Sequence, residues 1–457
     1  MYIGFDYGSA NCAVGLFNGD SVSLLPLDGD DSYLSSTLYS YDSALIAEAV
    51  LARLPEDLAP AYRRARAAEL SRAAKARRDW DLAPNEQTVF VGRAAIEHYL
   101  EFPGEGFYVR SPKSFLGAVG LRPEQQALFE DIVTLMMQEI KARAERVLGS
   151  VIRGAVIGRP VNFQGIGGED SNRQAESILR LAAARAGLEE VSFLYEPLAA
   201  GFDFEARLEA DATVLVVDVG GGTTDCSLVR MGPSHKSAKD RSQDCLGHSG
   251  QRIGGNDLDI ALAMQAFMPS FGLGSNLMTG KPMPSQPFWQ AVAVNDVSAQ
   301  REFAALATGN LIKELKKDAS QPELLTRFER LRSRQQNFHL VRLAEAVKVA
   351  LGEAESARTG LPNGEEELEI GRLDFNNAIG PQLEKIAALM HSAVQNSAVH
   401  NVGAAPDIVY VTGGSSRCQA VAERIGQVFP GVPVVSGDHF GSVTAGLARA
   451  AAALNRK

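Results

Sequence analysis

The chain has 457 residues, more than one hydrophobic core normally serves, so we expect at least two domains. Its net charge of −10 disfavours nucleic acid as a main partner, and none of its apolar runs approaches the ~20 residues that a membrane-spanning helix needs. The cysteines (Cys12, Cys226, Cys245 and Cys418) form no CxxC pair, which predicts a reducing compartment without a disulfide framework or a zinc site. The N-terminus lacks a signal-peptide pattern, so the expected location is cytoplasmic.

The first predicted element is a hairpin at the N-terminus. An apolar strand at 2–5 runs into the polar turn DYGSAN, and a second apolar run, CAVGLF, follows at 12–17. The stretch LVVDVGGGTTDCSLVRM at 215–231 has the same plan: a strand that ends in aspartate, a glycine turn and a second strand. Asp6 and Asp218 therefore occupy equivalent places in two hairpins.

A second pattern also occurs in both halves of the chain. GAVIGRPVNF at 154–163 and DIVYVTGGSSR at 407–417 each contain a buried strand that ends in glycine and precedes a helix start. The recurrence of both patterns predicts a duplicated α/β core in which each half contributes one phosphate-binding turn.

Helical patterns lie between these strands, at 124–148, 171–187 and 381–399. The second of them opens with a capping-box pattern and closes on a glycine. Two further segments are predicted insertions. One is helical and rich in alanine and arginine, at 43–83, and the other, at about 269–340, begins with a loop rich in Gly, Ser and Pro.

Residues 61–78, within the first insertion, carry seven basic side chains and one acidic side chain, Glu69. Such a run is most often a solvated helix face, and we adopt this interpretation. Docking of an acidic partner or of nucleic acid is the alternative.

The glycine turn at 220–222 indicates the chemistry of the site. Without Cβ atoms, its backbone N–H groups can approach a phosphate closely. Asp218 and Asp225 flank the turn and repel phosphate unless a divalent cation lies between them, and Mg²⁺ binds carboxylates together with phosphate oxygens and water. The pattern predicts a magnesium–nucleotide site. A plain glycine-rich hairpin is the alternative, which the matching hairpin at Asp6 disfavours.

Further segments extend this pattern along the chain. In order they are FDYGSANCAVGLF, VRSPKSFLG, VIGRPVNFQG, NRQAESILRLAAARAGL, FLYEPLAAGFDF, VVDVGGGTTDCSL, RIGGNDLD, AEAVKVAL and IVYVTGGSSR. Together they resemble the ATPase domain of the DnaK-type 70-kDa heat-shock chaperones, in the actin/hexokinase superfamily, and most closely a chaperone-like bacterial subgroup that ends after this domain.

The resemblance implies an α/β architecture with the actin-like ATPase fold, in which two duplicated RNase-H-like lobes surround a nucleotide cleft. Lobe I would comprise 1–206, with the insertion at 43–83, and would be completed by a C-terminal helix at 441–457. Lobe II would comprise 207–440, with the insertion at about 269–340 in its outer subdomain.

The resemblance also implies the metal-binding and catalytic residues. Asp6 and Asp218 would hold Mg²⁺ through water molecules. The implied catalytic residues are Lys113, Glu196, Thr223 and Asp225. Lys113 would position the γ-phosphate and the attacking water, and Glu196 would order that water, with Asp225 as a second candidate. Hydrolysis of this kind depends on positioning and charge neutralisation.

The implied cofactors are ATP or ADP with Mg²⁺. The residues implied at the phosphates are Gly8, Ser9, Ala10, Gly220, Gly221, Gly222 and Thr223. Those implied at the ribose and the adenosine are Glu345, Lys348, Gly413, Gly414 and Arg417.

Several positions depart from the family pattern. The first phosphate turn normally carries two threonines and here has Ser9 and Ala10, of which the alanine still offers its N–H. Val349 stands where an arginine normally stacks on adenine, which could cost about 1 kcal/mol. Gly352 replaces a base-contacting serine, and Asn256 lies where the family motif contains a glutamate. We therefore expect the phosphate and metal end of the site to be better formed than the base end.

The implied function is that of a chaperone-like, heat-shock-related ATP-binding protein. It would bind Mg-ATP between its lobes, hydrolyse it slowly to ADP and phosphate as a weak ATPase, and by lobe closure regulate a protein partner or client. A peptide-binding domain after the closing helix is not expected, so chaperone activity rests on analogy. A small-metabolite kinase of the same superfamily and a non-enzymatic actin-like scaffold are the alternatives. Neither a nucleic-acid nor a membrane partner is expected, and the oligomeric state is not predicted.

Overall fold

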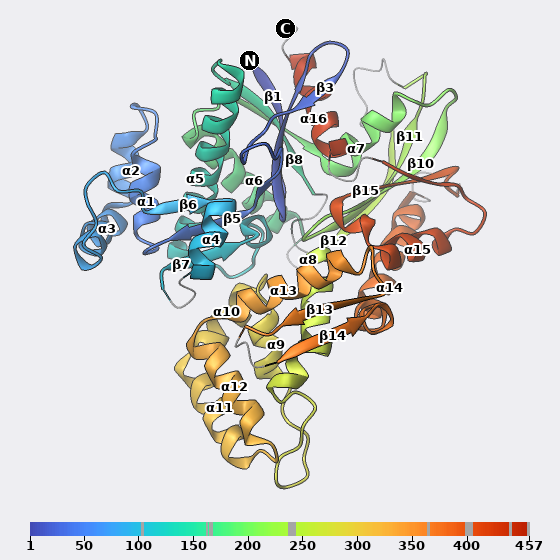
Figure 1. Ribbon diagram of the computed structural model, residues 1–457. Coiled ribbons are helices and arrows are strands. Elements are labelled where there is room, and N and C mark those ends of the chain that lie inside the picture. The colour runs from blue at the N-terminus through green and yellow to red at the C-terminus, as the bar shows by residue number, and fades with distance from the viewer. Residues whose placement is uncertain are drawn as a thin grey trace.

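The structure is a computed structural model that describes residues 1–101, 105–160, 163, 168–235, 244–362, 366–397, 405–437 and 441–454. Two β-sheets form its centre, and helices pack around and between them (Figure 1). Within these described ranges, every helix is either too short or too polar to cross a membrane.

The first sheet contains β1 (Tyr2–Tyr7), β2 (Asn11–Phe17), β3 (Val22–Leu24), β4 (Leu34–Ser35), β8 (Gly154–Arg159) and β9 (Glu190–Tyr195). Its order is β3-β2-β1-β8-β9, and β4 pairs with β2. The hairpin of β1 and β2 is antiparallel, whereas β8 runs parallel to β1 and β9 runs parallel to β8. The parallel neighbours are joined by long connections that contain helices, as parallel pairing requires.

The second sheet contains β10 (Ala212–Val219), β11 (Thr224–Met231), β12 (Cys245–Gln251), β15 (Ile408–Thr412) and β16 (Val434–Ser436). Its order is β12-β11-β10-β15-β16, with an antiparallel hairpin of β10 and β11 followed by parallel strands. The two sheets therefore repeat one topology. Asp6 lies opposite Ala13 in the first hairpin, and Asp218 lies opposite Asp225 in the second. The predicted α/β class with a duplicated core is confirmed.

Two helices, α7 (Glu196–Glu205) and α16 (Gly441–Leu454), pack between the sheets. Their apolar side chains form one buried cluster with β8 and β10. Gly446 permits the close approach of the two helices, because a Cβ at this position would overlap the backbone of Ala199. The junction between the two halves is thus a packed core rather than a flexible connection.

The outer part of the first half consists of a small sheet and a set of helices. Their bounds are β5 (Thr37–Ser40), β6 (Val89–Val91), β7 (Phe107–Arg110), α1 (Leu45–Leu51), α2 (Ala59–Ala65), α3 (Ala67–Asp79), α4 (Arg93–Glu101), the 3₁₀ turn η1 (Pro112–Phe115), α5 (Pro123–Leu148) and α6 (Gly168–Arg185). α5 and α6 cover the first sheet, while α1, α2 and α3 lie at the edge of the molecule (Figure 1). The helical pattern at 43–83 thus corresponds to α1, α2 and α3.

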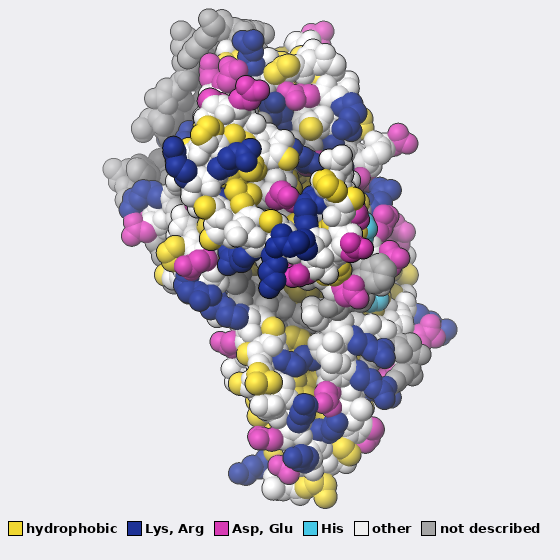
Figure 2. Space-filling view, turned by 90° about the vertical axis from the view of Figure 1, so that its left-hand side faces the viewer, with side chains coloured by type: hydrophobic (Ala, Val, Ile, Leu, Met, Phe, Trp, Pro, Cys, Tyr) yellow, Lys and Arg dark blue, Asp and Glu magenta, His cyan; other side chains and the backbone are white. Residues whose placement is uncertain are grey.

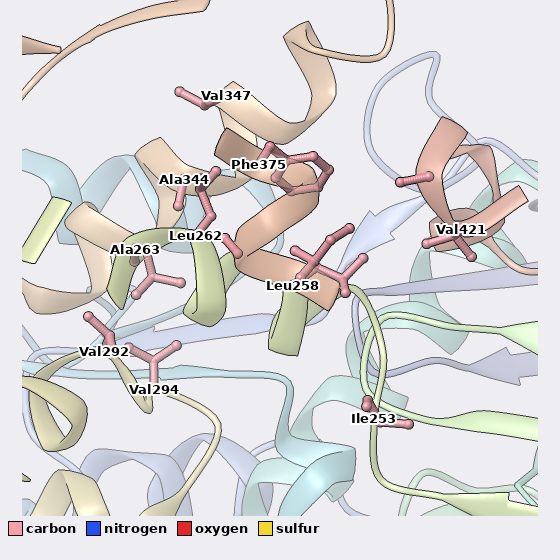
Figure 3. Close-up of a cluster of buried hydrophobic side chains, with 14 of the residues drawn as sticks. Ile253, Leu258, Leu262, Ala263, Val292, Val294, Ala344, Val347, Phe375 and Val421 are labelled. Atoms are coloured by element: carbon pink, nitrogen blue, oxygen red, sulfur yellow. The ribbon is translucent and has the colours of Figure 1, made fainter. Parts of the chain in front are cut away.

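The rest of the second half is mainly helical. Its elements are α8 (Gly255–Leu262), the π-helical turn η2 (Ala263–Phe267), the 3₁₀ turn η3 (Met268–Phe271), α9 (Gln286–Val292), α10 (Val297–Ala304), α11 (Leu306–Asp318), α12 (Pro322–Ser333), α13 (Asn337–Ala350), β13 (Ser356–Gly360), β14 (Glu367–Gly371), α14 (Arg372–Ser397), the 3₁₀ turn η5 (Gly414–Arg417) and α15 (Gln419–Val428). Figure 3 shows Leu258 and Leu262 of α8 converging with Ala344 of α13 and Phe375 of α14 in one buried core. This core fixes α8 and α13 relative to the second sheet.

The helix expected at 381–399 differs from the observed α14, which begins at Arg372 and passes through Pro381. A proline inside a helix removes one backbone hydrogen bond and costs ~3 kcal/mol, so the sequence pattern placed the helix start at this proline. Phe375 and Ile379, before the proline, and Ile386, after it, are all buried in the same core. Their packing outweighs the local cost of the proline.

Candidate functional site

A cavity of about 370 Å³ lies between the two halves of the molecule. Both hairpin turns, the start of α7, the helix α13 and the turn after β15 contribute to its wall. The predicted site residues that line it are Asp6, Gly8, Ser9, Ala10, Lys113, Glu196, Asp218, Gly220, Gly221, Thr223, Glu345, Lys348, Gly413, Gly414 and Arg417. Residues from Asp6 near the N-terminus to Arg417 near the C-terminus therefore border one space.

The two glycine turns face each other across this cavity. A Cβ on Gly221 would lie 2.5 Å from the Cβ of Ala10, and a Cβ on Gly222 would lie 2.9 Å from the Cβ of Ser9. Only glycines allow the second turn to approach the first so closely, which leaves backbone N–H groups of both turns beside one space. This arrangement is an anion-binding concavity of the kind that holds phosphate.

Gly413, directly after β15, closes the same end of the cavity. It has a φ of +84°, and a Cβ there would overlap the carboxylate of Asp218. The hydroxyl of Ser415 donates a hydrogen bond of 2.8 Å to the carbonyl of Gly220. The turn after β15 is thereby attached to the phosphate-binding turn of the neighbouring strand.

Asp6 and Asp218 lie at the ends of the equivalent strands β1 and β10 and face the cavity. Burial, together with the negative charge of Glu196, raises the pKa of Asp6 to about 7, although Lys113 opposes the shift. Burial raises the pKa of Asp218 well above its ordinary value, and Glu196, Asp225 and Asp6 add to the effect. The site thus concentrates carboxylates that repel one another, which is the donor set that a divalent cation would neutralise.

Lys113 supplies the positive charge at this end of the cavity. It lies in η1, is 4% exposed, and donates a hydrogen bond to Oε1 of Glu196 at the start of α7. Burial works to lower the pKa of Lys113, but Glu196 and Asp6 outweigh burial, so the pKa is raised. The ammonium group therefore stays charged inside the cleft.

The backbone just before Lys113 is held by both halves. Ser111 has a left-handed conformation with a φ of +54°, which is unusual for a residue other than glycine. Its N–H donates to the carbonyl of Ser36, and its hydroxyl accepts a hydrogen bond of 3.1 Å from Asn256 of α8. The position of Lys113 thus depends on a contact from the second half.

Two predicted residues, Gly222 and Asp225, do not line the cavity. Gly222 is placed beside Ser9, behind the turn. Asp225 is 1% exposed on β11, directly opposite Asp218, and its charge raises the pKa of that neighbour. Its effect on the site is therefore exerted through Asp218.

The predicted ribose residues Glu345 and Lys348 lie on α13 and are already engaged. Arg110 of β7 donates a hydrogen bond of 2.9 Å to Glu345, and Lys348 lies 2.6 Å from the buried carboxylate of Asp259. Burial works to raise the pKa of Glu345, but Arg110 and Lys348 outweigh it and lower the pKa. For Asp259, burial prevails over Lys348 and raises the pKa to about 6.

Sequence reasoning missed Arg110 and Asp259. Both stand inside segments that carry the resemblance, Arg110 in VRSPKSFLG and Asp259 in RIGGNDLD. The available signals were an arginine close to Lys113 in the sequence and an aspartate in the second turn of a helix, but neither reveals which partner lies across the cleft.

The end of the cavity where the base is predicted to bind is open to solvent. Val349 and Gly352 line it, and the side chain of Val349 is 67% exposed. A second cavity of about 170 Å³ continues from there and shares Lys348, Gly352 and Cys418 with the first.

Within the ranges that the structure describes, no group of three or more His, Cys, Asp or Glu side chains has an arrangement that holds a metal ion by itself. Asp6 and Asp218, one from each half, nevertheless fit a cation that retains water and takes phosphate oxygens as further ligands. Mg²⁺ binds in this manner, with few protein ligands. The residues present therefore fit magnesium bound together with a phosphate group.

Comparison with known proteins agrees with this geometry. Residues 119–274 match the model of the family described as Hsp70 protein. The chain is 31% identical over 189 residues to chaperone protein dnaK3 of Synechococcus elongatus, which covers 40% of this chain and 23% of the relative. It is 36% identical over 130 residues to chaperone protein dnaK1 of Nostoc sp., which covers 28% of this chain and 17% of that relative.

The chain carries a domain of the Hsp70/DnaK type. Its two duplicated sheets are those of the actin-like ATPase fold. The matched segments span less than a quarter of the length of these curated relatives. The Hsp70 family match includes Glu196 and Asp218, whereas Asp6, Lys113 and Arg417 lie outside it and are brought to the same cavity by the fold.

Proposed function

We propose that this chain binds Mg-ATP in the cavity between its halves, hydrolyses it slowly to ADP and phosphate, and couples nucleotide-dependent closure to a protein partner. The observation that supports hydrolysis best is the pairing of Lys113 with Glu196 beside Asp6 and Asp218, where the two glycine turns meet. A chaperone-like ATP-binding function agrees with the Hsp70 family match and with the names of the curated chaperone relatives. A cytoplasmic location is part of the proposal.

The two turns would hold the phosphates through their backbone N–H groups. Gly8 and Ala10 offer these groups from the first half, and Gly221 offers one from the second, whereas the N–H of Gly220 donates to the carbonyl of Thr223 within its own turn. Because each half supplies one turn, a bound triphosphate makes contacts that favour the closed arrangement of the halves. Binding of this kind needs no threonine hydroxyl at Ala10.

Asp6 and Asp218 would hold Mg²⁺ through water, and the bound ion would supply neutralisation of phosphate charge. Protonation competes with this role, because both carboxyl groups have raised pKa values in the ligand-free protein.

Lys113 and Glu196 would act on the terminal phosphate and on the attacking water. The Lys113 ammonium stays charged and stabilises the negative charge on the phosphoryl oxygens. The Glu196 carboxylate accepts a hydrogen bond and can orient water for in-line attack. Each loss of such a positioned group typically lowers the rate 10²- to 10³-fold.

Slow hydrolysis is expected from the first turn. Ser9 is 8% exposed and lies beside Gly222, while Ala10 has no hydroxyl with which to contact a phosphate or a water molecule. The turn can therefore bind phosphate through its backbone but offers fewer groups to position the nucleophile.

The division into a first lobe at 1–206 and a second lobe at 207–440 is part of the proposal. The packing of α16 on β1 and β2 supports its assignment to the first lobe, and residues 455–457 of the expected helix lie outside the described residues. The contacts of Arg110 and Ser111 with α13 and α8 connect the two lobes across the cleft. Closure of the cleft would change the outer surface that the two lobes present to a partner.

The experiment is a phosphate-release assay on the full chain, combined with calorimetric titration of ATP in the presence and absence of magnesium. Lys113→Ala is expected to lower release at least ~100-fold. Asp218→Asn is expected to weaken the magnesium-dependent part of ATP binding. Lys317→Ala, at an exposed position on α11, serves as the matched control and should leave both measurements unchanged.

Equal phosphate release by the wild type, Lys113→Ala and Asp218→Asn would refute the catalytic part of the proposal. Absence of heat from millimolar ATP with magnesium would refute nucleotide binding itself. Release of free phosphate in the absence of any added metabolite would distinguish hydrolysis from the kinase alternative.

A further inference from the structure

A basic arm lies at the edge of the first half, outside the nucleotide cavity. We define the basic arm as residues 59–79, which form α2 and α3. In Figure 1 these helices project from the side of the molecule. Figure 2 views that side and shows Lys and Arg side chains gathered on it. The family match at 119–274 does not include this segment.

The basic arm is held rigidly by charged and apolar contacts. Arg66, at the bend between its two helices, is 7% exposed and lies 2.8 Å from Asp131 and 2.7 Å from Glu130 of α5. Arg77 forms two hydrogen bonds, of 2.8 and 3.0 Å, with the carboxylate of Glu48 in α1. These two arginines point inward, so they hold the arm in place and are not available to bind a partner.

The remaining cations of the arm point outward. Arg63, Arg64, Lys75 and Arg78 are exposed, and among the described residues none of these four has a carboxylate within 4 Å. Arg72 is also exposed but pairs with Glu69. The exposed residues between the cations are mainly alanines, which leave the charged groups accessible. A rigid surface with several unpaired cations binds an anion without the cost of ordering a loop.

The charge of the arm opposes that of the molecule. Residues 61–78 carry seven basic side chains and one acidic side chain, so the rest of the chain has a net charge of −16, against −10 for the whole. Exposed acidic residues also lie at both ends of the arm. They are Glu56 and Asp57 before α2, and Asp79 and Asp81 at and beyond the end of α3. The positive surface is therefore short and bounded by negative charge.

We propose that the basic arm is a docking surface for a short acidic segment of a partner protein. α3 has 13 residues and is ~20 Å long, which an extended peptide of about six residues can span. Charges beyond ~8 Å are screened at physiological salt, so such a segment interacts with the arm and not with the acidic remainder. A long nucleic acid would continue past both ends and meet the bounding carboxylates.

A membrane surface fits the arm less well than an acidic peptide. Interfacial helices need large apolar side chains opposite their basic face. The large exposed apolar residue near the arm is Trp80, and its ring packs against that of Tyr41, with the ring centroids 5.4 Å apart. The outward face otherwise offers alanines, which bury little area.

The proposal is tested by fluorescence anisotropy with a labelled octapeptide of glutamate and the full-length chain at low and at high salt. The triple variant Arg64→Glu, Lys75→Glu, Arg78→Glu is expected to bind the peptide about tenfold or more weakly than the wild type. The matched control Lys281→Glu, Lys313→Glu, Lys317→Glu carries the same change in net charge on the outer helical part of the second half. The affinity of this control for the peptide should fall less than twofold.

Equal losses in the two triple variants, or no salt-dependent binding by the wild type, would overturn the proposal. So would tighter binding of a 20-base-pair duplex or of phosphatidylserine vesicles than of the peptide. If the wild type dimerises and the arm variant does not, the arm binds a second copy of the chain and not a partner protein, which would also overturn the proposal. Arg64→Lys with Arg78→Lys, which retains the charge, should bind like the wild type, because the proposal requires positive charge at these positions and not arginine itself. Asp218→Asn should leave peptide binding intact, which separates this surface from the nucleotide site.

Discussion

Arg110 and Glu345 join the two halves of the molecule, with the guanidinium of β7 2.9 Å from the carboxylate of α13. They are 235 positions apart in the chain. The same arginine lies 3.3 Å from Oδ1 of Asn256, and its neighbour Ser111 accepts a hydrogen bond from the amide of that asparagine. Three positions later the same segment provides Lys113. The contact between β7 and α13 is therefore linked through a short segment to Lys113.

Arg110→Gln tests this link. The substitution removes the ion pair to Glu345 and with it one of the charges that lower the pKa of that carboxyl group. We expect a destabilisation of about 1–2 kcal/mol, because one partner of a partly buried pair remains. We also expect several-fold faster dissociation of a fluorescent ATP analogue, measured by stopped flow. Arg358→Gln removes an exposed pair with Glu369 and should change neither quantity.

Asp218→Asn should stabilise the ligand-free protein while impairing its function. Asp218 is buried among Glu196, Asp225 and Asp6, and their mutual repulsion is part of what raises its pKa. Removal of one charge relieves this repulsion, and we expect ~1 kcal/mol of added stability without ligand. Thermal denaturation should show a higher Tm for the variant alone and a smaller further rise with Mg-ATP than the wild type shows. A lower Tm of the ligand-free variant would contradict this account of the cluster.

The stability of the ligand-free protein should fall as the pH rises from about 4 to about 7. An unfolded aspartate has a pKa near ~3.9, whereas the pKa of Asp6 is raised to about 7. Over this range the folded protein retains a proton that the unfolded chain has released, so deprotonation favours unfolding. Urea denaturation at several pH values should show a smaller slope for Asp6→Asn. Asp20→Asn, at an exposed position, should reproduce the wild-type slope.

Gly221→Ala should separate the two phosphate-binding turns. The added Cβ would lie 2.5 Å from that of Ala10, a distance that requires one backbone to move. We expect the affinity for ATP to fall at least about tenfold by calorimetry, since the backbone N–H groups of the two turns no longer converge. Gly426→Ala, in α15, meets no atom within 4 Å and should instead stabilise the protein by ~0.5–1 kcal/mol. Unchanged ATP affinity in Gly221→Ala would show that the turns do not act together.

Local sequence patterns were sufficient for the two hairpins. A strand, an aspartate and a glycine turn are determined by neighbours along the chain, so the equivalence of Asp6 and Asp218 follows from the sequence alone. The same holds for α5, whose observed span of Pro123–Leu148 agrees with the predicted one. Family resemblance added Lys113 and Glu196, which single-residue chemistry would not have distinguished from surface charges.

Tertiary structure decided the features that depend on segments far apart in sequence. Because Phe375 and Ile379 are packed in the core, α14 begins before Pro381, although a proline disfavours a helix at this position. Folding also brought Arg110 to Glu345, placed Asp259 beside Lys348, and turned Arg66 inward while Arg63 and Arg64 face solvent. Short-range order follows from the φ/ψ and burial preferences of adjacent residues. Ion pairs across the cleft depend on how the two packed halves meet, and a short stretch of sequence does not contain that information.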